Sequence, residues 1–292
     1  MILIDYTQVV LGSIIVSLNR GEDLDDKLVR HITLNNLRYY RSRFKEEYGE
    51  LVICTDDKHY WRRDYFPNYK ANRKKDREAS SYDWNEIFSA VNMIRDELDT
   101  YFPYKVLHID GAEADDIIGV LLLNRAEDKN IIISSDKDFI QLHTDVIDQY
   151  SPVTKKMVNS KNPLDYLKEH ILKGDRSDGI PNVLSPDDTF VTEKRQKPMR
   201  KTIIAELLEQ MIYLDPAMQP DTLSTLARCP KDTWIRNWQR NETLIDLTKI
   251  PEEIVEDILY EFDGQVEGYR GNLLNYFIDN KLNNLMNEIQ EF

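Results

Sequence analysis

Asp5, Asp56 and Asp136 each stand at the end of a short apolar run of the kind that forms a buried β-strand. In an open parallel sheet, the carboxyl ends of the strands meet at one edge, and ligands bind there. We therefore expect these three carboxylates to lie along the same edge, where they would form a negatively charged cluster.

Further acids are expected at that edge. The segment 113–116 opens a helix directly after another strand, and Asp138 follows Asp136 by two residues. Asp175 and Asp178 have the i, i+3 spacing that places two side chains on one face of a turn. Nine acids from five segments are thus predicted to converge: Asp5, Asp56, Glu113, Asp115, Asp116, Asp136, Asp138, Asp175 and Asp178.

So many carboxylates in one place repel one another and resist ionisation unless cations bind. Hard divalent ions with oxygen ligands relieve that repulsion, and Mg²⁺ is the first choice, with Mn²⁺ able to substitute. No histidine or cysteine joins the set, which argues against zinc. Any single acid after a strand is also explained as a turn former or a helix cap, but independent turn formers need not share one sheet edge. The joint pattern favours a metal site.

One segment of this negatively charged chain is strongly basic. The net charge of −14 alone disfavours a nucleic-acid partner, yet residues 58–77 carry eight Lys and Arg against two Asp, a net charge of +6. Aromatic residues alternate with these cations, and single-stranded nucleic acid binds to stacking faces beside positive charge. A solvated surface loop, or aromatics that pack that loop on the core, is the alternative.

The elements that position these residues alternate between strands and helices. Strands are expected at 2–4, 51–54, 104–109 and 131–133, and helices at 24–48, 84–101, 113–127 and 163–173. This order predicts an α/β fold with a mostly parallel, doubly wound sheet. From about residue 185 the pattern changes to helices and loops. We therefore expect a catalytic domain over 1–184, with a basic loop or arch over 58–81, and a smaller helical part over 185–292.

Composition bounds the class of protein. The 292 residues are 41% hydrophobic, which suits a folded chain with a sizeable core. The longest apolar stretch, near 117–123, is far too short to span a bilayer, and the N-terminus lacks the basic start of a secretory signal. With two cysteines, a disulfide framework is not expected. We expect a cytoplasmic protein whose partner is nucleic acid rather than membrane.

Three motifs carry a family resemblance. The chain contains Glu-Ala-Asp-Asp at 113–116, Ser-Asp-Lys-Asp at 135–138 and Gly-Asp-Arg-Ser-Asp-Gly-Ile-Pro at 174–181. In this order they resemble the 5′ nuclease family, which includes flap endonucleases and the 5′-exonuclease domains of bacterial DNA polymerases. Tyr-Lys-Ala-Asn-Arg at 69–73 is similar to that family's segment at the base of a helical arch. The segments 61–64 and 287–292 resemble the ribonuclease H branch found in T-even bacteriophages.

This resemblance implies a Mg²⁺-dependent 5′-3′ nuclease with two metal ions about 4 Å apart. It would act on RNA–DNA hybrids, duplex 5′ ends and forked or flap DNA, and would remove RNA primers during phage lagging-strand replication. Asp175 and Asp178 would belong mainly to the second metal site, and Asp116 would be a ligand or a partner of one. Lys70 and Arg73 would place positive charge at the reacting phosphate. A sliding clamp and a single-strand-binding protein are implied as partners of a monomeric enzyme.

The segment after residue 181 departs from the family pattern. The family continues with a second glycine-rich turn, whereas this chain has Leu-Ser-Pro-Asp-Asp-Thr-Phe at 184–190 and a basic insertion. A modified helix–three-turn–helix is therefore expected. The residues expected to contact nucleic acid are Arg62, Arg63, Tyr69, Lys74, Lys75, Lys194, Arg195, Lys197, Arg200 and Lys201.

Two other classes of protein remain as alternatives. A single-strand ribonuclease of the PIN type shares an acidic α/β site but is smaller, has fewer acids and lacks the C-terminal half. A non-catalytic DNA-binding or scaffold protein on a nuclease fold would be expected to have lost some of the nine acids, and all nine are present.

Overall fold

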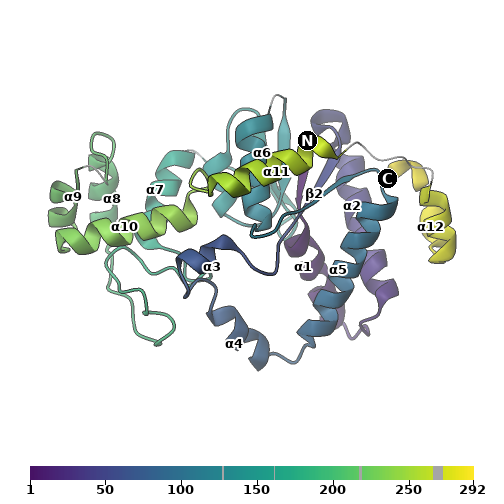
Figure 1. The fold of residues 1–292 in the computed structure, drawn as a ribbon, viewed down its shortest axis with the longest axis horizontal. Helices are drawn as coiled ribbons and strands as arrows, with labels where there is room; N and C mark the ends of the chain where they lie inside the picture. Colours follow the sequence, from purple (N-terminus) through teal and green to yellow (C-terminus); the bar gives the residue numbers. More distant parts are fainter. Residues whose placement is uncertain (127, 161, 217–218, 266–271) are drawn as a thin grey trace. The chain divides into compact units, whose positions relative to one another are not determined.

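A computed structural model describes most of the chain (Figure 1). Its contacts divide the chain into two compact units. The described residues are 1–126, 128–160, 162–216, 219–265 and 272–292. The first unit contains 1–58, 83–159 and 252–292, and the second contains 59–82 and 160–251. This division differs from the boundary expected after residue 184, because the C-terminal segment belongs with the sheet and the basic segment belongs with the later helices.

The first unit is built on a six-stranded sheet in the order β3-β2-β1-β4-β5-β6. Every neighbouring pair is parallel except β5 and β6, which confirms the expected mostly parallel, doubly wound α/β fold. The central strands are apolar and fully buried, as a sheet covered on both faces requires. Their bounds are β1 Ile2–Asp5, β2 Leu51–Thr55, β3 Lys105–His108, β4 Asn130–Ile133, β5 Ile147–Ser151 and β6 Lys156–Met157.

Helices cover both faces of this sheet. α1, α2 and α5 pack together and contact strands, while α6 contacts β1 and β2, and α11 contacts β3 and α6. Asp5, Asp25 and Asp83 begin α1, α2 and α5 by accepting backbone hydrogen bonds, which satisfies donors that the first helical turn leaves unpaired. The helix bounds are α1 Tyr6–Asn19, α2 Asp26–Tyr48, α5 Trp84–Tyr101, α6 Ala114–Arg125, α11 Glu252–Gly264, α12 Leu273–Asp279 and α13 Asn283–Met286. Short 3-10 helices span η1 Asp138–Leu142 and η3 Ile289–Glu291.

The C-terminus is buried in the first unit. Phe292 is fully buried and packs edge-on against Phe102 and Phe277, with ring centroids 5.8 and 5.2 Å away. Arg38 forms an ion pair with Glu291 at 3.1 Å. These contacts explain why the segment 252–292 groups with the sheet.

The second unit is helical, as the sequence after residue 185 predicts. Its core contains Trp234, Leu207, Leu223, Tyr69 and Val183, all at most 1% exposed. Its helices are α3 Trp61–Tyr65, α4 Asn72–Ala79, α7 Pro163–Lys173, α8 Lys201–Gln210, α9 Pro220–Leu226 and α10 Lys231–Ile245. Among the described residues of both units, none of the helices has the length and apolarity that a membrane crossing requires.

Candidate metal centre and basic segment

Ser134 connects two of the expected metal ligands at the ends of adjacent strands. Its hydroxyl donates a hydrogen bond to Asp5 Oδ2 at 2.7 Å, and the backbone N–H of Asp136 donates to the same hydroxyl at 3.0 Å. Gln149 fixes the segment further by donating to the carbonyl oxygens of Ser134 and Asp136. The parallel pairing of β1 with β4 therefore places Asp5 and Asp136 at one edge, as the sequence predicts.

The carboxyl group of Asp5 is strongly perturbed. Burial, followed by the negative charges of Asp56 and Asp136, raises its pKa to about 8, against the opposing hydrogen bond from Ser134. The ionised form therefore needs a positive charge nearby at neutral pH. A divalent cation bound among these carboxylates would supply that charge.

The first turn of α6 adds three acids. Glu113, Asp115 and Asp116 each offer a carboxylate oxygen, and these oxygens lie within 4.8 Å of one another. Asp56, the residue after β2, joins this group, since its Oδ1 accepts a hydrogen bond from the backbone N–H of Ala114 at 2.9 Å. The positive end of the α6 dipole stabilises these negative charges in part.

Asp116 also has a structural role. It is fully buried, its Oδ2 accepts a hydrogen bond from the backbone N–H of Glu113 at 3.0 Å, and the two residues form a reciprocal capping box. Asp138 lies farther along the same edge, where its backbone N–H donates to Asp136 Oδ1 at 3.0 Å and η1 begins. Seven of the nine expected acids thus belong to one unit, and their donor set is made of oxygen, which fits a hard divalent cation.

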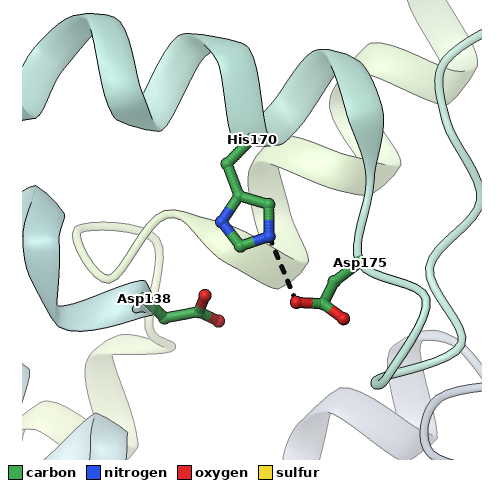
Figure 2. A group of neighbouring side chains, drawn as sticks. All are labelled: Asp138, His170 and Asp175. Carbon is green, nitrogen blue, oxygen red and sulfur yellow. Dashed lines mark hydrogen bonds and ion pairs between the residues drawn. The ribbon is translucent and has the colours of Figure 1, made fainter. Parts of the chain in front are cut away.

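Asp175 lies in the second unit and organises a tight turn. Its Oδ1 accepts hydrogen bonds from the N–H and hydroxyl groups of Ser177 and from the N–H of Asp178. Figure 2 shows the ring of His170, on α7, turned toward Asp175, and its Nε2 lies 3.2 Å from Oδ2. Burial alone would raise the pKa of Asp175, but the hydrogen bonds from His170 and Ser177 outweigh it and hold that pKa well below its usual range.

The expectation that no histidine lies among the acids is therefore wrong. His170 stands five residues before Asp175, in the last turn of α7, and only the reversal of the chain at Gly174 brings the two together. A His near a helix C-terminus followed by Gly-Asp is the sequence signal that could have indicated the contact.

Asp178 faces the basic segment rather than Asp175. Arg73 donates to its Oδ1 at 2.7 Å, the hydroxyl of Tyr69 donates to its Oδ2 at 3.0 Å, and the ammonium of Lys70 lies 3.5 Å from Oδ2. The motif at 69–73 and the motif at 174–181 are thus joined within the second unit. Because Asp175 and Asp178 belong to this unit, convergence of all nine acids on one edge stays a prediction.

Three polar residues of α10, not singled out by sequence reasoning, hold the loop after Asp178. Asn241 donates to the carbonyl oxygens of Ile171 and Pro181, Arg240 donates to that of Pro181, and Asn237 donates to that of Val183. All three side chains are buried at 5% exposure or less. Their spacing places them on one face of α10, and in sequence they read as ordinary surface polar residues.

The cations of the basic segment have different surroundings. Arg62 is 1% exposed, and its Nε donates to the carbonyl oxygen of Leu244 at 3.0 Å. We therefore correct the expectation that Arg62 contacts nucleic acid, because its guanidinium is buried against that carbonyl oxygen. Tyr69 is also 1% exposed, and its hydroxyl donates to Asp178, so the expectation that Tyr69 contacts nucleic acid is corrected as well. Arg63, Lys74 and Lys75 are exposed.

The insertion at 190–200 forms a structured loop. Gln196 accepts a hydrogen bond from the N–H of Asn182, and the N–H of Lys197 donates to the hydroxyl of Ser185. Lys194 forms an ion pair with Asp188 at 2.8 Å. The cations expected to contact duplex phosphates are exposed on this loop and at the start of α8: Lys194, Arg195, Lys197, Arg200 and Lys201.

Comparison with known protein families accounts for both halves of the chain. Residues 27–170 match the family of the 5′-3′ exonuclease N-terminal resolvase-like domain, and residues 161–292 match the C-terminal family of T4 RNase H. Together with the similarity to a phage ribonuclease H over nearly the whole chain, these matches show that the chain belongs to the 5′ nuclease family of 5′-3′ exonucleases, as its motifs indicate.

The particular relatives fit this assignment. Ribonuclease H of Enterobacteria phage T4 is 35% identical over 99% of this chain and 95% of its own length. A 5′-3′ exonuclease of Buchnera aphidicola is 34% identical over 46% of this chain and 47% of its own length. A structure of the bacteriophage T5 D15 flap endonuclease with DNA and metal ions covers 90% of this chain and 98% of its own, with a TM-score of 0.62 and 17% identity. At that identity the T5 structure bears on the fold alone.

Proposed function

We propose that this enzyme is a Mg²⁺-dependent 5′-3′ nuclease that acts on RNA–DNA hybrids, duplex DNA 5′ ends and flaps. We further propose that it removes RNA primers in phage lagging-strand replication, as a monomer in the host cytoplasm. The observation that carries the proposal is the cluster around Asp5, whose pKa of about 8 results from burial beside Asp56 and Asp136. Such crowding is costly unless a cation binds, and it is the arrangement that metal-dependent hydrolysis needs.

The first unit provides the ligands for the metal. The residues that would hold Mg²⁺ are Asp5, Asp56, Glu113, Asp115, Asp136 and Asp138, with Asp116 supporting Glu113. When bound, such an ion lowers the pKa of a coordinated water and stabilises negative charge on the phosphate oxygens. Ser134 and Gln149 orient Asp5 and Asp136, so the ligands are fixed before the substrate arrives.

The second unit provides the cations. Lys70 and Arg73 would stabilise the negative charge that builds on the reacting phosphate, Lys as a point charge and Arg through paired N–H groups. Arg63, Lys74 and Lys75 belong to the same segment, and the exposed cations of 194–201 would contact duplex phosphates farther away. Similarity to T4 ribonuclease H over 99% of the chain supports the substrate class.

A second ion is the finer part of the proposal, and its ligands would be Asp175 and Asp178. Three protein donors reach Oδ1 of Asp175, whereas only His170 lies at Oδ2. Oδ2 would therefore be the oxygen of Asp175 that holds an ion. The role proposed for the first unit does not depend on this second ion. Calorimetric titration with Mg²⁺ or Mn²⁺ counts the ions.

Two rival functions predict different results. A non-catalytic scaffold would bind forked DNA without cleaving it, and a PIN-type ribonuclease would cleave single-stranded RNA without a duplex. Clamp and single-strand-binding proteins are proposed as partners on the family resemblance alone, and pull-down with the purified proteins tests them.

The deciding experiment is digestion of a 5′-labelled RNA–DNA hybrid and of a flap substrate, with Mg²⁺ or with chelator. We expect short 5′-phosphorylated products from both substrates in Mg²⁺ and none in chelator. Asp136→Asn is the matched inactive control. Binding without cleavage in Mg²⁺ would favour the scaffold, and cleavage of single-stranded RNA alone would favour the PIN-type enzyme.

A further inference from the structure

Asp178 holds three side chains of the basic segment at once. Both of its carboxylate oxygens are used, Oδ1 by Arg73 at 2.7 Å and Oδ2 by Tyr69 at 3.0 Å and Lys70 at 3.5 Å. The side chains of Asp178 and Lys70 are only 13% and 9% exposed. Such a shielded pair differs from a surface ion pair, because each charge would be costly without the other.

The backbone also joins Lys70 to Asp178. The N–H of Lys70 donates to the carbonyl oxygen of Asp178 at 2.7 Å. Lys70 has a φ of 54°, a left-handed conformation that costs a non-glycine residue about 1 kcal/mol, and this hydrogen bond compensates for it. At the next position, a Cβ on Gly179 would lie 2.8 Å from the carbonyl oxygen of Asn68. Only glycine lets the two segments approach this closely.

The ammonium of Lys70 is set in an aromatic pocket. Its Nζ lies 4.8 Å from the ring centroid of Tyr69 and 5.6 Å from that of Tyr60. Rings stabilise a cation only in part, and an ammonium removed from water needs a carboxylate to balance it. Asp178 provides that charge, and it also fixes Arg73 in the first turn of α4.

We propose that Asp178 is a positioning residue that sets the places of Lys70 and Arg73, in addition to any contact it makes with a metal. The role of the two cations at the phosphate rests on the proposed function, whereas the coupling between Asp178 and Lys70 does not. Asp175 shapes the turn that presents Asp178, and α10 holds the loop behind it. The pair Asp175 and Asp178 thus has a positioning role that can be measured in protein without metal.

The test is a double-mutant cycle on the full chain in chelator. Asp178→Asn keeps the shape of the side chain but removes the negative charge that faces the ammonium of Lys70. Lys70→Met removes that ammonium and retains the apolar stem. We expect Asp178→Asn to lower the melting temperature, and the double variant to melt about 3 °C or more above Asp178→Asn alone. Additive effects of the two substitutions would overturn the proposal.

A matched control comes from the same unit. Lys231 and Asp221 form an ion pair at 2.9 Å with side chains 48% and 78% exposed. The cycle of Lys231→Met and Asp221→Asn should show no resolvable coupling, since exposed pairs contribute little. Equal coupling in both cycles would mean that the Asp178 result reflects only general charge effects, and would contradict the proposal.

Kinetics separate positioning from metal binding. If Asp178 positions Lys70 and Arg73, single-turnover cleavage by Asp178→Asn should fall about 10-fold or more and stay low at high Mg²⁺. Asp178→Glu, which restores the charge, should recover part of that loss. Full recovery of Asp178→Asn at high Mg²⁺ would assign the residue to the metal alone. If wild-type protein cleaves none of the substrates, the proposed function fails while the stability cycle still decides the coupling.

Should Asp178→Asn not fold, Arg73→Gln gives an independent measurement. Arg73 is 43% exposed, so its substitution leaves the core intact. Amide exchange at 71–76 in metal-free Arg73→Gln should be faster than in wild type, with exchange in α7 unchanged. Unchanged exchange at 71–76 would overturn the proposal.

Discussion

The hydroxyl of Ser134 donates a hydrogen bond to Asp5 Oδ2 at 2.7 Å, and this bond joins the ends of two adjacent parallel strands. It opposes the rise in the pKa of Asp5 that burial and the charges of Asp56 and Asp136 cause. Ser134 thus keeps a crowded carboxylate closer to its ionised form. The carboxylates around Asp5 repel one another in the metal-free protein, and this has consequences for stability.

Asp5→Asn should stabilise the metal-free protein at alkaline pH. The native state keeps the Asp5 proton up to a pKa of about 8, whereas the unfolded chain loses it near pH 4. The native state therefore binds more protons in between, so the stability contributed by this group falls as pH rises from about 4 to 8. We expect the variant to be more stable than wild type by about 2 kcal/mol near pH 8, with a smaller difference near pH 5.

Urea unfolding in chelator at the two pH values measures this difference, and saturating Mg²⁺ provides the control. A cation stabilises wild type by binding the native state, so the order of the two proteins should reverse in Mg²⁺. Equal stability of wild type and Asp5→Asn at pH 8 in chelator would mean that Asp5 is not perturbed.

Asp136→Asn should abolish hydrolysis while leaving nucleic-acid binding intact. Asp136 lies at the edge where Asp5 and Asp138 also lie, and losing its charge weakens stabilisation of the transition state. We expect a loss of about 100-fold or more in single-turnover rate, with less than a twofold change in affinity for a flap substrate. Turnover close to wild type in Mg²⁺ would remove Asp136 from the ligand set.

The strands and the acids that follow them could be predicted because their signals are local. A run such as Ile131–Ile133 fits a buried parallel strand, and an acid after it falls at the carboxyl edge whatever the rest of the chain does. Helix α5 can also be predicted from local signals, since Asp83 caps it and the apolar spacing continues to Tyr101. By contrast, α1 has apolar residues around its whole circumference and several β-branched ones, so no helical period marks it.

The rest depends on tertiary contacts that no short segment of sequence contains. Arg62 resembles its basic neighbours, and only the position of Leu244, 182 residues away, makes it an interior residue. Asp178 could be recognised as functional, but its contact with Lys70 requires the close approach at Gly179. The return of residues 252–292 to the sheet depends on contacts of α11 with β3 and α6 and on the packing of Phe292. These relationships join residues far apart in sequence, and they determine which charges are available to a substrate.

Arg62→Ala should affect stability and Arg63→Ala should affect nucleic-acid binding, although the two residues are adjacent. Arg62→Ala leaves the carbonyl oxygen of Leu244 without a buried donor, so the free energy of unfolding should fall by about 2 kcal/mol. Arg63→Ala should leave stability unchanged and reduce the salt dependence of binding by a slope of about one. Urea unfolding and binding titrations at several salt concentrations measure both quantities. A reduced salt slope for Arg62→Ala would place its guanidinium at the substrate.

Lys70 and the cations of the insertion should serve different phosphates. Charge at the reacting phosphate matters most when negative charge builds in the transition state, so Lys70→Met should lower the rate with little change in affinity. Cations that bind distant duplex phosphates act equally on the ground and transition states. Neutralising Lys194, Arg195 and Lys197 together should therefore weaken binding and flatten its salt dependence, by a slope of about one for each phosphate that is no longer neutralised.

Single-turnover titrations of both variants at two salt concentrations separate these roles. At saturating enzyme, the triple variant should cleave at close to the wild-type rate, because only its binding step is impaired. Lys70→Met should remain slow at saturation and keep the wild-type salt slope. Asp188→Asn is the matched control for the insertion, since Asp188 pairs with Lys194 at 2.8 Å and its substitution leaves that cation in place. If both variants lose rate at saturation and neither changes the salt slope, the insertion contributes to the reacting centre instead of the duplex, and the proposed division between the two basic regions is wrong.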